Sequence, residues 1–164
     1  MKFVSVIMGS KSDYAVVQEC LKTLDHLGVR YEVLVASAHR SPDRVKEYIT
    51  QAEKKGAQVF IAAAGMAAHL AGAICAVTTK PVIGVPLSGG ALDGLDALLS
   101  TVQMPSGMPV ATLAIGKAGM INAAYLATQI LALCDEKLSE VLKKDRQEKV
   151  RKLESDSEEI EVYL

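Results

Sequence analysis

The chain has 164 residues, half of them apolar, which is enough for one domain with a buried core. Its formal net charge is −1 and its Lys and Arg residues form no basic stripe, so the composition argues against a nucleic-acid or anionic-membrane partner. A small substrate or another protein is the expected partner.

Short apolar runs alternate with helical periodicity through most of the chain, which is the pattern of strand–helix units around a parallel sheet. In the first unit we predict a strand over 3–8, a polar turn over 9–13 and a helix from Val16 to Leu27. Gly28 is suited to end that helix in a left-handed conformation.

The second unit has the same organisation. A strand over 31–36 leads into the loop Ser37-Ala38-His39-Arg40. Ser41 can then cap a helix that has Pro42 at its first position, and Gly56 ends this helix.

The rest of the chain up to residue 133 continues the alternation of strands and helices. The predicted elements are a strand over 59–64 with a Gly65-Met66 turn, a short helix over 69–77, strands over 82–85 and 110–115, and helices over 95–99 and 118–133. Five strands of this kind predict an α/β fold with a parallel five-stranded sheet between two layers of helices.

Polar loops follow three of these strands, over 9–13, 37–40 and 65–69. In a doubly wound sheet, ligands bind at the carboxyl ends of the strands, where the strand order reverses. We therefore expect the three loops to share one site. The stretch from Val59 to Thr79 has no charged residue, but its many Ala and Gly residues favour a buried strand and a tightly packed helix over a membrane span.

Beyond Leu133 the composition becomes highly charged, which divides the chain into an α/β domain over 1–134 and a C-terminal helix and tail over 135–164. Apolar residues are too sparse there to cover much core, so we expect this helix to pack on a neighbouring subunit; a solvated tail is the alternative. The helix face is marked by Leu138, Val141 and Leu142, followed by Val150 and Leu153. Alternation at Ile160, Val162 and Leu164 indicates a terminal strand only weakly.

The loop Gly9-Ser10-Lys11-Ser12-Asp13 lies between a strand and a helix start, where backbone amides and hydroxyls attract phosphate. Neither a Walker loop nor a dinucleotide fingerprint is present. A purely structural alternative has Ser12 as a helix cap and Asp13 beside the helix dipole.

His39 is the best candidate for a proton carrier, because imidazole exchanges protons near neutral pH and Arg40 beside it offers a forked donor for phosphate. His69 follows a run of small residues and could assist His39, bind the ligand or cap a helix. His26, near a helix end, is expected only to complement the helix dipole.

The three cysteines, Cys20, Cys75 and Cys134, are far apart, so we predict neither a disulfide framework nor a metal site, and a reducing compartment. The N-terminus does not have the features of a signal peptide. Both observations lead us to expect a cytoplasmic location.

Four motifs in order closely resemble those of the bacterial N5-carboxyaminoimidazole ribonucleotide mutase family of purine biosynthesis, over about residues 4–133. The motifs are Met8-Gly9-Ser10-x-Ser12-Asp13, Ser37-Ala38-His39-Arg40-x-Pro42, Ala64-Gly65-x-Ala67-Ala68-His69-Leu70 and Gln103-Met104-Pro105-x-Gly107-x-Pro109-Val110.

The resemblance implies a flavodoxin-like fold and a homo-octamer whose sites include residues from neighbouring subunits. It also implies transfer of a carboxylate from the exocyclic nitrogen of a ribonucleotide to ring carbon C4, without metal or cofactor. By the same resemblance His39 would be the general acid and base. The residues expected to bind the substrate are Ser10, Ser12, Asp13, Ser37, Ala38, Arg40, Gly65, Ala67, His69 and Leu70.

Two features depart from the family pattern: Met66 stands where many relatives have Gly, and the loop Leu87-Ser88-Gly89-Gly90-Ala91 is unusual. Two alternatives remain. Related enzymes carboxylate the aminoimidazole ribonucleotide directly with CO2 and commonly have Lys after the His, so Arg40 favours the mutase. A non-catalytic flavodoxin-type nucleotide-binding module would be expected to have aromatic residues in the binding loops, yet none lies in the three loops.

Overall fold

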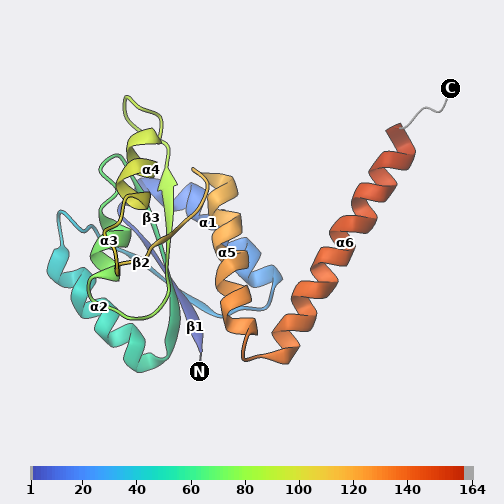
Figure 1. Cartoon of the computed structure of the whole chain (residues 1–164), viewed down its shortest axis with the longest axis horizontal. Helices are drawn as coiled ribbons and strands as arrows, with labels where there is room; N and C mark the ends of the chain where they lie inside the picture. Colours follow the sequence, from blue (N-terminus) through green and yellow to red (C-terminus); the bar gives the residue numbers. More distant parts are fainter. Residues whose placement is uncertain (1, 161–164) are drawn as a thin grey trace.

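A computed structural model describes residues 2–160 of the chain. Its sheet has five parallel strands in the order β2-β1-β3-β4-β5 (Figure 1). This order is the flavodoxin-like one, with the topological switch point between β1 and β3. The strands are β1 (Phe3–Met8), β2 (Tyr31–Val35), β3 (Ala57–Gly65), β4 (Val82–Leu87) and β5 (Ala111–Thr112).

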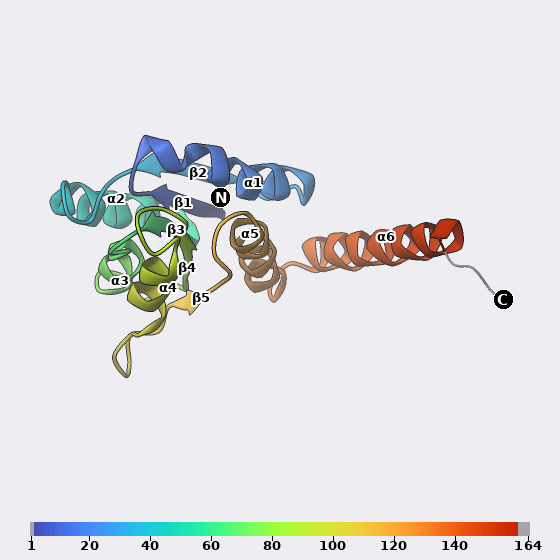
Figure 2. The same cartoon turned by 90° about the horizontal axis from the view of Figure 1, so that it is seen from above.

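Helices cover both faces of the sheet and form the predicted three layers (Figure 2). On one face lie α1 (Tyr14–His26) and α5 (Lys117–Ala132), and on the other lie α2 (Pro42–Lys55), α3 (Leu70–Cys75) and α4 (Leu95–Val102). Alternate residues of β1 enter the two cores, with Val4 and Val6 packed on the α1 and α5 side and Ile7 on the opposite side. Strands buried on both faces explain the continuous apolar runs in the sequence.

The fifth strand is shorter than the predicted 110–115, because only Ala111 and Thr112 form a ladder with β4. Further along, Leu113 N–H donates to Gly84 O and Gly116 N–H donates to Pro86 O. The chain therefore advances three residues while β4 advances two, so the regular register ends although contact with β4 continues.

The predicted helix ends at Gly28 and Gly56 are confirmed, since both residues have left-handed φ angles, of 69° and 113°. The prediction that the Ser41 side chain caps α2 is wrong. Ser41 does occupy the N-cap position before Pro42, but its hydroxyl accepts from Ser37 N–H and donates to Ser37 O, at 3.0 and 3.1 Å. The hydroxyl is therefore used to close the preceding loop.

The last described helix, α6 (Glu136–Ile160), projects away from the α/β body (Figures 1 and 2). Leu138 and Leu142 pack against the core near its start, and Asp145 is its single buried residue among those described. Ile160 ends this helix, and the rest of the alternating segment, at Val162 and Leu164, lies outside the described residues. Within residues 2–160, no helix has the length and apolar character needed to cross a membrane.

Candidate active site

A cavity of about 560 Å³ opens at the carboxyl edge of the sheet, between the loops that follow β1, β2, β3 and β4. It lies at the switch point, where flavodoxin-like sheets bind their ligands. All the residues predicted to form the site lie in its wall: Ser10, Ser12, Asp13, Ser37, Ala38, His39, Arg40, Gly65, Ala67, His69 and Leu70. Three segments far apart in the sequence thus meet as expected.

The loop after β1 forms a short 3-10 turn over Lys11–Asp13 that is capped by Ser10, and not by Ser12. Ser12 N–H donates to Ser10 Oγ at 3.3 Å, and Ser10 N–H donates to Asp13 Oδ2 at 3.0 Å, which together form a capping box. The hydroxyl of Ser12 also donates to Ser10 Oγ, at 2.9 Å. These bonds hold the hydroxyls and the carboxylate together at the cavity wall.

Asp13 has a raised pKa. Its partial burial raises the pKa and outweighs the lowering effects of hydrogen bonds from Ser10 and Ser12 and of the positive charge of Arg40. The site therefore contains a carboxyl group that is less acidic than an exposed aspartate.

The loop after β2 is tied to the loop after β1 through Arg40. Arg40 N–H donates to Ser37 Oγ at 3.2 Å, and its Nη2 donates to the carbonyl oxygen of Gly9 at 3.1 Å. The second bond uses one of the five N–H groups of a guanidinium, so the rest of the fork can still bind an anion. Arg40 thus brings positive charge to the loop that sequence analysis predicted as a phosphate site.

His39 and His69 come from different loops and lie side by side. Their ring centroids are 5.3 Å apart and the rings are tilted by 47°. His69 occupies the N-cap position of α3 without a side-chain capping bond, so of the alternatives considered for it, capping by the imidazole does not occur. Both rings are exposed at the cavity wall, where an imidazole can reach a ligand and exchange a proton with it.

His26 lies outside this cavity. It does occupy the last turn of α1, but its Nε2 is 3.0 Å from Asp145 Oδ1 on α6. The prediction that His26 only complements the dipole is therefore wrong, since it also joins two helices.

The loop after β4 contributes Ser88, Gly89 and Gly90 to the cavity, a role that was not predicted for them. Their position directly after an apolar strand could have indicated this role, because the same position identified the other three loops. Met66 also lines the cavity. Among residues 2–160, no group of three or more His, Cys, Asp or Glu side chains is arranged to hold a metal ion.

A second cavity, of about 740 Å³, lies between α5 and α6 and is separate from the loops at the switch point. Its wall includes Tyr125, Arg146 and Lys149. It contains no histidine and none of the predicted site residues, so the switch-point cavity is the candidate for chemistry.

The topology defines a flavodoxin-like α/β domain, and the cavity described above lies at its switch point. The model of one family, AIR carboxylase, matches residues 3–152. The chain belongs to this family.

Curated relatives are similar over most of their length and are named N5-carboxyaminoimidazole ribonucleotide mutase. The protein of Pseudomonas aeruginosa is 53% identical over 87% of this chain and 88% of its own. That of Bacillus subtilis is 53% identical over 88% and 89%, and that of Pyrococcus horikoshii is 49% identical over 96% and 88%. The crystal structure of Treponema denticola PurE has a TM-score of 0.89, covers 99% of this chain and 100% of that one, and supports the fold at 24% identity.

Proposed function

We propose that this protein is an isomerase of purine biosynthesis that moves the carboxylate of N5-carboxyaminoimidazole ribonucleotide from N5 to C4. The product is 4-carboxy-5-aminoimidazole ribonucleotide. Membership of the AIR carboxylase family and the names of relatives about half identical in sequence support this reaction. The observation that carries the proposal is the meeting of His39 and His69 with a serine-rich loop and Arg40 around one cavity.

The loop after β1 and Arg40 are proposed to bind the phosphate of the ribonucleotide. Ser10 and Ser12 supply hydroxyl groups, and Arg40 supplies a guanidinium held against Gly9. Asp13, whose pKa is raised by burial, could donate or accept a hydrogen bond at the same end of the ligand. Binding of the remote phosphate would orient the reacting ring in the cavity.

His39 is proposed to carry the proton in both halves of the reaction. In the first half the bond between N5 and the carboxylate carbon breaks, CO2 is released, and N5 takes a proton from the imidazolium. In the second half C4 forms a bond to the CO2 carbon, and the proton on C4 passes to the imidazole. The acid lost in the first half is thus restored in the second, so one imidazole can serve both steps.

His69 lies close enough to His39 to influence its position, because the two rings are in contact. Ser37 and Ala38 are expected to shape the wall beside His39, with Gly65, Ala67 and Leu70 doing so beside His69. Small side chains there would allow the aminoimidazole ring to approach the backbone closely.

The decisive experiment supplies synthetic N5-carboxyaminoimidazole ribonucleotide to the purified chain without ATP and measures the C4-carboxylated product. Rapid product formation above the enzyme-free rate supports the mutase. A parallel reaction supplies the non-carboxylated ribonucleotide and bicarbonate. Turnover only in this second reaction, at a physiological CO2 concentration, would instead identify a direct carboxylase, and turnover in neither would leave a non-catalytic binding module.

A homo-oligomer, with the octamer of the family as the expected form, is the second part of the proposal. Leu142 packs against the core, and the Lys149 ammonium lies over the Tyr125 ring of α5. Leu153 follows Leu142 by eleven residues, and Ile160 follows Lys149 by eleven, so both lie on the same face of α6, and both are exposed. An apolar helix face that continues beyond its own body is suited to pack on another copy of the chain. The domain division at residues 134 and 135 then separates the α/β body from a helix used for assembly.

A cytoplasmic location is proposed because the proposed substrate, a phosphorylated biosynthetic intermediate, would be available in that compartment. Buried thiols at Cys20 and Cys75 are consistent with a reducing compartment.

A further inference from the structure

Met66, the residue that follows β3, has an unusual backbone conformation. Its φ is 51°, which places a long side chain in the left-handed region, and among non-glycine residues in the described range only Asp93 shares a positive φ. An L residue is disfavoured there, so the fold holds Met66 in a conformation that would suit glycine. Such strain commonly occurs where a side chain has a functional position.

The side chain of Met66 lies over the loop that follows β4. A Cβ atom built on Gly90 would lie 3.4 Å from Met66 Cγ and 3.5 Å from Met66 Sδ. Gly90 itself has a φ of 68°, and Asp93 and Gly94 later in the same loop also have positive φ values. The Met66 side chain therefore extends from the loop after β3 to the loop after β4, and it lies close to the space that a side chain at position 90 would occupy.

Met66 is also tied to the segment that carries the second imidazole. Ala68 N–H donates to Met66 O at 2.8 Å, and His69 N–H donates to Ala67 O at 2.7 Å. Met66, His69 and His39 all line the same cavity, and Met66 is 60% exposed. Met66 is thus part of the cavity wall and is also open to solvent.

We propose that Met66 is a retaining residue, whose thioether closes the cavity against the loop after β4 and keeps released CO2 beside C4. This inference rests on the proposed function. Between cleavage of the N5–carboxylate bond and formation of the C4–carboxylate bond, the cavity holds a small, uncharged and weakly bound molecule. A flexible apolar side chain can follow the outline of the bound nucleotide and exclude water, and it does so without offering CO2 a nucleophile.

The test compares Met66→Gly and Met66→Ala with Met66→Leu. Each enzyme receives unlabelled N5-carboxyaminoimidazole ribonucleotide in ¹³C-bicarbonate, and mass spectrometry measures both the ¹³C fraction of the product and the free aminoimidazole ribonucleotide. An enzyme-free blank is subtracted because carbamates lose CO2 spontaneously. We expect both quantities to rise several-fold in the Gly and Ala variants, because CO2 escapes and exchanges, and to stay near the wild-type values in the Leu variant.

Thermal unfolding separates this role from a purely structural one. Met66→Gly removes the left-handed strain, so its Tm should not fall below that of the wild type. A structural role would lower Tm and turnover while leaving the ¹³C fraction unchanged. A ¹³C fraction equal to the wild type in both the Gly and Ala variants would overturn the proposal, whereas a wild-type enzyme that forms no product would overturn the proposed function.

Discussion

Several polar side chains in the candidate site form hydrogen bonds with backbone groups of their own loops. Ser10 caps the turn before α1, Ser37 accepts from Arg40 N–H, and Ser41 closes the loop around Ser37. Such bonds reduce the number of conformations that each loop can adopt, and this pre-organises the groups that face the cavity. His39 differs because it is exposed and its ring contact is with His69.

Replacement of His39 by Asn should lower kcat by about 10²–10⁴-fold, the usual contribution of a general acid and base. The Tm should change little, because the His39 side chain is exposed. Steady-state kinetics and a thermal melt measure the two effects. A matched variant, His26→Asn, removes an imidazole outside the cavity and should retain kcat. Near-wild-type turnover of His39→Asn would falsify the assigned role.

Replacement of Asp13 by Asn should weaken substrate binding but leave Tm at pH 7 equal or slightly higher. Burial raises the pKa of Asp13, so its ionised form is disfavoured in the folded state. This penalty is present at neutral pH and disappears as the pH falls through the raised pKa towards the ordinary value of 3.8. The Tm difference between variant and wild type should therefore shrink on acidification.

Thermal melts between pH 7 and pH 4 and substrate titrations measure these effects. Asp156→Asn, which removes an exposed carboxylate far along α6, is the control and should change neither quantity. A Tm for Asp13→Asn well below that of the wild type at pH 7 would contradict the interpretation.

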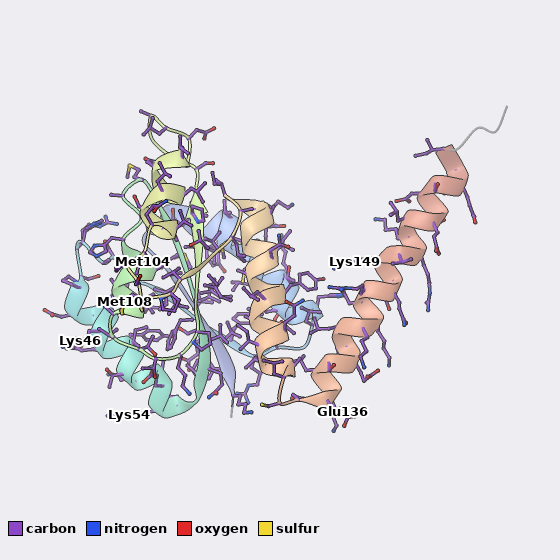
Figure 3. All side chains as sticks on the ribbon, viewed as in Figure 1. Lys46, Lys54, Met104, Met108, Glu136 and Lys149 are labelled. Carbon is purple, nitrogen blue, oxygen red and sulfur yellow. The ribbon has the colours of Figure 1, made fainter. Side chains whose placement is uncertain are left out.

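Besides the apolar contacts of Leu138 and Leu142 near its start, α6 is attached to the body through one buried carboxylate. Asp145 accepts hydrogen bonds from His26 Nε2 on α1 at 3.0 Å, from Tyr125 OH on α5 at 3.0 Å, and from Lys149 Nζ at 2.8 Å. The Lys149 ammonium also lies 3.9 Å from the centre of the Tyr125 ring, and Figure 3 shows this side chain directed from α6 towards α5. Three helices thus share a single acceptor.

The pKa values of this cluster follow from its geometry. Burial raises the pKa of Asp145, but hydrogen bonds from Lys149, His26 and Tyr125 outweigh burial and hold the pKa below its ordinary value. Burial lowers the pKa of Lys149, but the bonds to Asp145 and Tyr125 outweigh that effect and raise it. The attachment of α6 is therefore strongest when Asp145 is ionised and Lys149 is protonated.

Replacement of Asp145 by Ala should lower the free energy of unfolding by about 1–3 kcal/mol at pH 7, because three donors lose their buried acceptor. The difference in free energy of unfolding between the wild type and Asp145→Ala should disappear at both ends of the pH range. It should be lost as the pH falls below about 3.8 through the lowered pKa of Asp145, and again as the pH rises beyond about 10.5 through the raised pKa of Lys149. Denaturant titrations across pH measure this. The control is Glu148→Ala, which removes an exposed carboxylate from α6. An equal loss of unfolding free energy in both variants would contradict the role of Asp145 in attaching α6.

Within residues 2–160, the strands β1 to β4 and the helices α1 to α5 were predicted well from periodicity, because they correspond to apolar patterns in the sequence, whereas α6 has few apolar residues and still continues as a helix to Ile160. The fifth strand was predicted too long, because its end depends on hydrogen bonds to β4 and not on the residues of 110–115 themselves. The convergence of the three site loops was predictable from topology alone. The contact of Met66 with Gly90 was not, because it depends on side-chain direction across two loops.

In the whole molecule, as far as residues 2–160 describe it, α4 and α6 have apolar surfaces that no other part of the chain covers. Leu95, Leu99 and Val102 on α4 are about half exposed, and Leu153 on α6 is 71% exposed. Met104 and Met108, by contrast, are partly buried, because they pack against the core on the side of the sheet that α2 and α3 cover (Figure 3). Exposed apolar faces on two separate elements are typical of a chain that assembles with copies of itself.

Replacement of Leu153 by Asp should shift the chain to a smaller assembly, because a charge would enter the proposed interface. Light scattering coupled to size-exclusion chromatography measures the mass. Lys152→Asp introduces the same side chain one residue away, on another face of α6, and should leave the mass unchanged. An unaltered mass for Leu153→Asp would exclude this part of α6 from the interface.

Local periodicity and residue types were enough to predict the alternation of strands and helices, the parallel sheet and the loops that could carry chemistry. Tertiary structure decided which groups meet. The bond of Arg40 to Gly9, the attachment of His26 to Asp145 and the placement of Met66 over Gly90 all join segments distant in the sequence. Such contacts depend on strand register, helix orientation and rotamers, which local patterns do not encode.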